Sequence, residues 1–205
     1  MAIIKLTKGE LKKQRDALKQ YERYLPTLQL KKQQLQLEIL RQSVILEEKK
    51  RNQERSRESI ISWIGLIDDP AISIKPYLVI DKVTTGLKNI AGVDIPVYGK
   101  TDFPPAEYDL FVAPLWVDAA IDNLRDYISL DTELSIIDKG ILMLKQELRI
   151  TTQRVNLFEK IKIPESKENI RLIKIYIGDQ LSNAVGRCKI AKRKIEELAL
   201  EGASL

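Results

Sequence analysis

The chain has 205 residues, of which 44% are apolar, 31% are charged and only 6% are aromatic, and its net charge is +5. Many charges and few aromatic residues favour long helices over a compact globule. One cysteine and no histidine argue against an internal disulfide, a zinc site or a Cys–His nucleophile, and the charged start of the chain argues against a secretory signal.

The first predicted element is a long helix over residues 7–68. Thr7 can cap its first turn, and Glu10 three residues later completes a capping box. Apolar residues at alternating steps of three and four mark the side of a helix that faces a coiled-coil partner. This first seam consists of Leu11, Gln14, Leu18, Tyr21, Leu25, Leu28, Lys32, Leu35, Ile39, Gln42, Leu46, Lys49, Gln53, Ser56, Ile60, Trp63 and Ile67.

Two features of this helix depart from a regular apolar pattern. Pro26 removes one backbone hydrogen bond, at a cost of ~3 kcal/mol. Because the first seam keeps its phase from Tyr21 to Leu28, we expect a kink rather than a break. The stretch from Glu47 to Glu58 has no apolar residue. It is either a solvated section from which the partner helix is spaced away, or a surface that another subunit covers through polar contacts.

The segment over residues 69–114 is rich in proline and predicts a small β-hairpin followed by an irregular loop, at the tip of the helices. The strand candidates are "YLVIDKVTT", residues 77–85, and "VDIPVY", residues 93–98, and "GLKNIAG" between them supplies turn residues. This glycine-containing stretch lacks the spacing of a phosphate-binding loop. The segment is also too small to form an enzyme domain.

The second predicted helix covers residues 115–200 and should bend near Pro164. Its seam again alternates between steps of three and four, and the apolar stripe resumes beyond the proline. This second seam consists of Tyr127, Leu130, Leu134, Ile137, Ile141, Leu144, Leu148, Thr151, Val155 and Phe158, and then of Ile170, Ile173, Ile177, Leu181, Ala184, Cys188, Ala191, Ile195 and Leu198.

The sequence therefore predicts a mainly α fold, in which two helices form one long antiparallel coiled coil with a hairpin in mid-chain. The second helix is longer than the first, so its C-terminal end should overhang by ~25 residues, or ~35 Å at helical rise. Ten residues are expected to form the centre of the coiled coil: Leu18, Leu25, Leu28, Leu35, Ile39, Leu134, Ile141, Leu144, Leu148 and Val155.

The polar residues of the second helix give no catalytic, cofactor-binding or metal-binding prediction. Asp118, Asp122, Asp126 and Asp131 interleave with Arg125 and are expected to form a solvated face. Near the C-terminus, the basic run consists of Arg187, Lys189, Lys192, Arg193 and Lys194. These cations either complement the helix dipole and face water, or form a sleeve that contacts a protein or a nucleic acid.

Three stretches resemble one family of proteins, in the right order along nearly the whole chain. "LTKGELKKQRDALKQYERYLPTLQLKKQQLQ" resembles the opening of the D subunit of V-type ATPases, and "NIAGVDIPVY" resembles the hairpin of that family. "TQRVNLFEKIKIP" is similar to its most recognisable segment, and this motif comprises Arg154, Val155, Asn156, Glu159 and Pro164. Pro26 and the stretch "LPTLQLKK" depart from many members and suggest a divergent bacterial branch.

The resemblance implies a central stalk subunit, the rotor shaft of a proton- or sodium-translocating ATPase, without an active site or cofactor of its own. Its implied partners are the A and B catalytic subunits, the small F subunit and the socket subunit of the membrane rotor. It would bind neither nucleotide nor nucleic acid and would be cytoplasmic, peripheral to the membrane. The basic run from Arg187 to Lys194 would then contact the bore of the A/B hexamer.

The helical architecture alone also fits other functions. A prefoldin-like chaperone has an antiparallel coil with a hairpin and grips clients with exposed apolar helix tips. The helical arm of some tRNA synthetases grips RNA, but such an arm is appended to a catalytic domain. Another coiled-coil adaptor is a further alternative, and binding to the A, B and F subunits would distinguish these functions.

Overall fold

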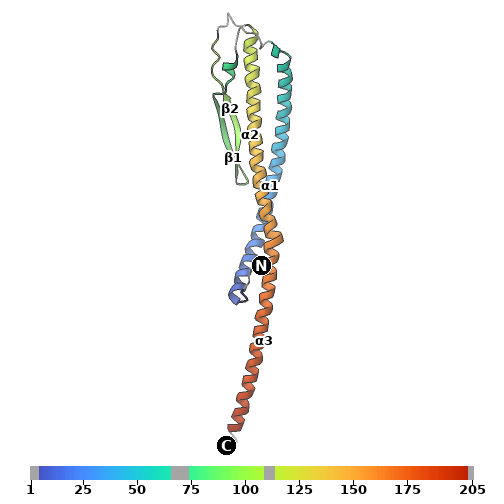
Figure 1. Ribbon diagram of the computed structural model, residues 1–205, viewed down its shortest axis with the longest axis vertical. Coiled ribbons are helices and arrows are strands. Elements are labelled where there is room, and N and C mark those ends of the chain that lie inside the picture. Colours follow the sequence, from blue (N-terminus) through green and yellow to red (C-terminus); the bar gives the residue numbers. More distant parts are fainter. Residues whose placement is uncertain (1–4, 66–73, 109–113, 203–205) are drawn as a thin grey trace. The chain divides into compact units, whose positions relative to one another are not determined.

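The computed structural model describes residues 5–65, 74–108 and 114–202 (Figure 1). It is mainly α-helical, with one antiparallel hairpin among the described residues. The elements in chain order are α1 (Lys8–Ile61), the 3₁₀ turn η2 (Lys75–Leu78), β1 (Lys82–Ile90), β2 (Val93–Asp102), α2 (Trp116–Leu157), the π-helical turn η3 (Phe158–Lys162) and α3 (Ile163–Gly202).

The chain divides into two compact units. One contains both ends of the chain, Met1–Gln29 and Gln153–Leu205, and is called the terminal unit here. The other, Leu30–Thr152, contains the hairpin and is called the hairpin unit. Helix α1 contributes to both, so its seam has a different set of neighbours in each unit.

Helix α1 begins with the expected cap at Thr7, but Glu10 does not complete a capping box, because its carboxylate accepts from the Gln14 amide and the Thr7 N–H donates to the Lys5 carbonyl. The backbone N–H of Glu10 donates to the Thr7 hydroxyl at 3.2 Å, which satisfies one of the free donors of the first turn. The helix is unbroken at Pro26, and the Thr27 hydroxyl donates to the Tyr24 carbonyl at 2.8 Å beside it. The α-helix ends at Ile61, and Asp68 lies outside the described residues.

The burial of side chains follows the two seams. Every described residue of the first seam is buried or half-buried, and so is every residue of the second seam as far as Ile177. Ile67 and the side chain of Leu198 lie outside the described part. Among the ten central residues, Leu35, Leu134, Ile141, Leu144 and Val155 are buried, and Leu18, Leu25, Leu28, Ile39 and Leu148 are half-buried.

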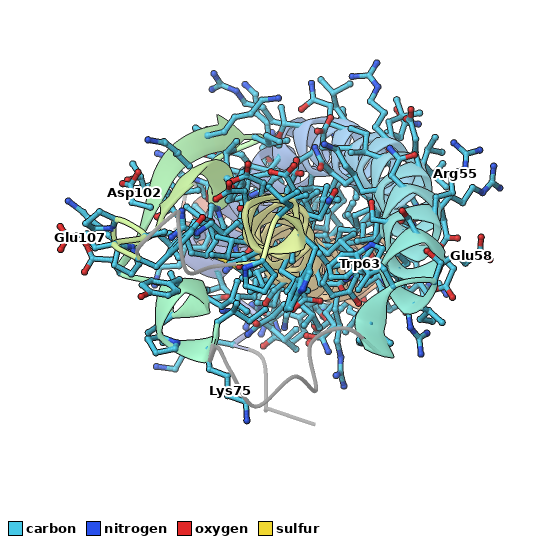
Figure 2. All side chains as sticks on the ribbon, turned by 90° about the horizontal axis from the view of Figure 1, so that it is seen from above. Arg55, Glu58, Trp63, Lys75, Asp102 and Glu107 are labelled. Carbon is cyan, nitrogen blue, oxygen red and sulfur yellow. The ribbon has the colours of Figure 1, made fainter. Side chains whose placement is uncertain are left out.

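The hairpin unit has three layers, with α2 between α1 and the hairpin (Figures 1 and 2). Leu35 of α1 and Leu144 of α2 are both 0% exposed because Ile95 of β2 packs against them as well. A second cluster joins Leu46 to Leu134 and Ile141. The hairpin thus lies along the helices and contributes to their core.

The polar stretch of α1 faces α2 of the same chain. Lys49 forms an ion pair with Glu133 at 2.9 Å, and the Gln53 amide donates to Asp131 at 2.8 Å. The partner helix is therefore within hydrogen-bonding distance and not spaced away. Arg55 and Glu58 point outward from the other side of α1 (Figure 2).

The first strand of the hairpin lies later in the chain than the sequence suggested, and the second begins at Val93 as expected but extends to Asp102. Gly86 to Ile90 belong to β1, and the turn itself consists of Ala91 and Gly92, with φ angles of 51° and 78°. Two consecutive positive φ angles are typical of the type I′ turn, whose twist matches that of paired strands. The Asn89 side chain stabilises this turn, because it accepts from the Gly92 N–H at 3.2 Å. The turn residues therefore lie within the stretch "GLKNIAG", but only its last two residues form the turn.

In the terminal unit, α1 runs antiparallel to α3. Tyr21 packs against Phe158 with ring centroids 5.2 Å apart, and Glu22 forms an ion pair with Lys167 at 3.3 Å. The helix is not broken at Pro164, because η3 precedes it. There the Ile163 N–H donates to the Phe158 carbonyl, five residues back. This wider turn makes room for a proline ring that would crowd a carbonyl of a regular α-helix.

A glycine in the hairpin gives the first prediction. The register shifts between Thr84 and Thr85, so Gly99 is an extra residue in β2, and a Cβ there would lie 2.9 Å from the Thr84 carbonyl oxygen. We expect Gly99→Ala to lower the free energy of unfolding by about 1–3 kcal/mol, measured by urea denaturation.

Gly86→Ala is the matched control in the opposite strand, because a Cβ at Gly86 meets nothing within 4 Å. It should change stability by less than about 1 kcal/mol. Equal losses for both variants would contradict the role of the bulge.

Candidate interaction surfaces

The notable surface features of the described residues are exposed apolar and charged areas that could contact another protein. No group of three His, Cys, Asp or Glu side chains in the described part could hold a metal ion. The grooves that line the helices are open and shallow, such as the one between Leu37, Leu40 and Leu148. Such surfaces suit the binding of another protein, so the exposed apolar residues are the first candidates.

One apolar stripe runs along α1 in the hairpin unit, away from its seam. Leu30, Leu37, Leu40 and Val44 are 56–67% exposed and recur at steps of seven, three and four residues. This spacing places them on one side of the helix. We call them the α1 outer face. This face was not predicted from the sequence, because the heptad pattern of α1 was assigned to a single seam, although the same spacing is present in the sequence.

A second exposed stripe lies on α3 in the terminal unit. Ile173 is fully buried, but the later second-seam residues Leu181 and Ile195 are each more than half exposed. The exposure of α3 rises where α1 no longer lies beside it. Helix α1 starts at Lys8, and α3 continues beyond that point (Figure 1). We call residues 178–197 the overhang. Cys188 was predicted to be a core residue and is exposed, because no helix of the described chain covers this part of the seam.

The basic run lies on the overhang and is exposed throughout. Lys192 forms an ion pair with Glu196 at 3.7 Å, and Arg193 with Glu197 at 3.0 Å. Arg187, Lys189 and Lys194 form no ion pair with the described residues. Pairs of this kind on an exposed helix contribute little to stability. The run therefore leaves cationic side chains free to meet an external surface.

The family motif contributes one core residue and several exposed ones. Val155 is buried in the seam, and Arg154, Asn156, Glu159 and Pro164 are exposed. Leu157 and Ile161 are exposed beside them, at 40% and 53%. The π-helical turn therefore presents a mixed apolar and polar surface. π-helical turns are frequent at functional sites.

Arg125 has a structural role that its place in the sequence does not indicate. Its guanidinium donates to the Tyr77 carbonyl at 3.1 and 3.0 Å and to the Pro104 carbonyl at 2.6 Å, and it stacks on the Phe103 ring at 5.4 Å. The prediction of a solvated residue was wrong, because this side chain holds η2 and the proline-rich loop against α2. No sequence spacing signals such contacts, since most of the partners are backbone carbonyls.

One ion pair on α3 changes the pKa of a carboxyl group. Arg171 donates to both oxygens of Glu168, at 2.9 and 2.7 Å, and this hydrogen bonding lowers the pKa of that carboxyl group. The pair is exposed, so it keeps the surface charge of α3 fixed to lower pH without adding to the core.

These features define the chain as a helical subunit with two exposed apolar stripes, the α1 outer face and the overhang. None of the described helices is both long and apolar enough to cross a membrane. The model of the family of ATP synthase D subunits matches residues 10–193. The chain belongs to this family.

The chain is also similar to curated proteins along almost its full length. It is 46% identical to the V-type ATP synthase D subunit of Borreliella burgdorferi, over 95% of this chain and 96% of that protein. It is 33% identical to the protein of the same name from Chlamydia caviae, over 95% of this chain and 94% of that protein. The similarity covers both units, so the same family assignment applies to the hairpin and to the overhang.

Proposed function

We propose that the chain is the rotating shaft of the central stalk in a V-type ATPase or ATP synthase. Family membership makes it a component of that complex and does not favour a prefoldin-like chaperone. The overhang is the observation that carries the shaft assignment. A helix that leaves its partner behind, with an exposed apolar stripe and cationic side chains, needs a surrounding surface to cover it.

The proposed surroundings of the overhang are the A and B subunits of the catalytic hexamer. Small residues at Gly178, Ala184, Gly186 and Ala191 keep this helix thin enough for a bearing. Attraction between exposed charges is screened beyond ~8 Å at physiological salt, so the basic run need not hold the shaft at one angle. The shaft can therefore contact the bore and still turn.

The other proposed partners bind elsewhere. The α1 outer face is assigned to the F subunit, because it is an exposed apolar stripe in the other unit and leaves the overhang free. A socket subunit would connect the shaft to the membrane rotor. The chain itself has no active site in this proposal and is cytoplasmic, at the surface of the membrane.

Mechanistically, the shaft couples distant sites through one stiff body. A shaft with an asymmetric cross-section makes different contacts with each of three catalytic interfaces, and these differences bias their affinities for nucleotide. Each turn exchanges the three states. Hydrolysis or synthesis in the hexamer is thereby linked to ion translocation by the membrane rotor.

Removal of the overhang tests the bearing. Truncation after Ile177 removes the last part of α3 but should leave the remaining helices folded and the F subunit bound, because the removed residues are largely exposed. Assembly with A and B, measured by co-purification, should weaken by at least about tenfold, or ~1.4 kcal/mol. A truncation after Glu197 is the control and should keep most of the assembly. Normal assembly and ATPase coupling of the shorter chain would contradict the assignment.

Charge reversal tests the basic run separately. Lys192, Arg193 and Lys194 changed together to Glu should weaken A/B assembly most at low salt, since screening reduces the effect as salt rises. Lys50, Arg51 and Arg55 changed to Glu give the same change in net charge on an exposed part of the hairpin unit. If both triple variants assemble alike, the basic run is only a solvated helix surface.

Pro164 tests the asymmetry of the shaft. Proline has no backbone N–H to donate within the helix, and the π-helical turn η3 directly precedes it. Both features support a bend there. Pro164→Ala should raise the free energy of unfolding, by up to ~3 kcal/mol, because alanine restores the backbone donor. It should nevertheless lower ATPase activity coupled to ion transport, because a straighter shaft makes more similar contacts with the three catalytic interfaces. Pro26→Ala is the control, because it restores a backbone donor within the continuous helix α1 and leaves η3 unchanged, so coupling should not change. Unchanged curvature by solution scattering, with unchanged coupling, would refute the bend.

A further inference from the structure

The start of α1 is held against α3 by weaker contacts than those that hold the rest of α1. All three residues of α1 that are buried, Leu35, Leu46 and Ile60, lie in the hairpin unit. In the terminal unit, the first-seam residues Leu11, Leu18, Leu25 and Leu28 are only half-buried. A two-helix pair has no third layer to cover them, so each contributes less burial of apolar surface.

The opposing surface of α3 is also partly polar. Ser166 and Asn169 are buried in it, next to Ile170 and Ile173. The Asn169 amide donates to the Gln14 side chain at 3.5 Å, a long hydrogen bond. The ion pair between Lys167 and Glu22 is more than half exposed on both sides. Separation of the two helices would return these polar groups to water, which offsets part of the lost apolar contact.

Helix α1 also has a proline, Pro26, near the end of the segment that α3 holds weakly. Pro26 lacks the N–H that would bond the Glu22 carbonyl, so the backbone there has one hydrogen bond less to lose on bending. It lies at the end of the weakly held segment, before the buried residues of the hairpin unit begin. Helix kinks are commonly located at proline.

We propose that Lys8–Leu25 is a strap that swings off α3 about Pro26 while the hairpin unit stays folded. The open form exposes Ile170 and Ile173 and joins them to the apolar stripe of the overhang. Local opening of this kind occurs at a lower free energy than global unfolding when a segment has few buried apolar contacts. The inference goes beyond the proposed function and does not need any partner protein.

Thiol labelling of the full chain tests the strap. In a Cys188→Ser background, Ile173→Cys places a thiol beneath the strap, and Leu144→Cys places one in the hairpin unit. Both positions are 0% exposed in the closed form. We expect the thiol at position 173 to react roughly 100-fold faster than the thiol at position 144 under native conditions, because the strap opens locally. Ile141→Cys replaces the control if Leu144→Cys loses helix content by circular dichroism.

Further variants in the Ile173→Cys background test which contacts control the opening of the strap. Gln14→Leu with Asn169→Ile replaces a polar pair, in which Asn169 is buried and Gln14 half-buried, by apolar side chains. The double variant should slow labelling about tenfold, since opening then exposes more apolar surface. Pro26→Ala should also slow it, whereas Lys167→Ala removes an exposed ion pair and should leave the rate within about twofold. Equal labelling at positions 173 and 144, or no effect of the apolar pair, would overturn the proposal.

Discussion

Burial of the apolar seam of α1 is the constraint on which the rest of the structure depends. In the terminal unit the α1 residues Leu18 and Leu25 remain half-buried, although Ile173 of α3 is fully buried there. In the hairpin unit Ile95 adds a third layer, and Leu35 and Leu144 become fully buried. The hairpin is therefore a structural part of the coiled coil, which it converts locally from two layers to three.

Local departures from ideal geometry keep this seam aligned. Ile170 follows Phe158 by 12 positions, whereas three turns of an α-helix take ~11 residues. The π-helical turn η3 accommodates the extra residue, so Val155, Ile170 and Ile173 are all buried. In the hairpin, the extra residue Gly99 has a similar effect on strand register. Each irregularity adds one residue without rotating the buried residues away from their neighbours.

The surfaces left uncovered fit a protein that works inside a complex. The α1 outer face and the overhang both expose apolar side chains that a free monomer would keep in water, and membership of the D-subunit family gives both a reason. A shaft must be stiff along its length but must also present surfaces to parts that move relative to it. Exposed apolar residues flanked by exposed charges satisfy both requirements, because the attraction between such charges is screened over long distances.

The sequence by itself determined the helices, both seams, the cap at Thr7 and the family, because heptad spacing and helix caps are local patterns. It also indicated the unequal helices, whose consequence is the exposed overhang. Tertiary structure decided the strand boundaries, the pairing of Lys49 with Glu133 and the place of Arg125, which binds the Tyr77 and Pro104 carbonyls. It also decided that Cys188 is exposed. These outcomes depend on which elements pack against each other. Contacts between residues far apart in the chain leave no periodic pattern in the sequence from which they could be predicted.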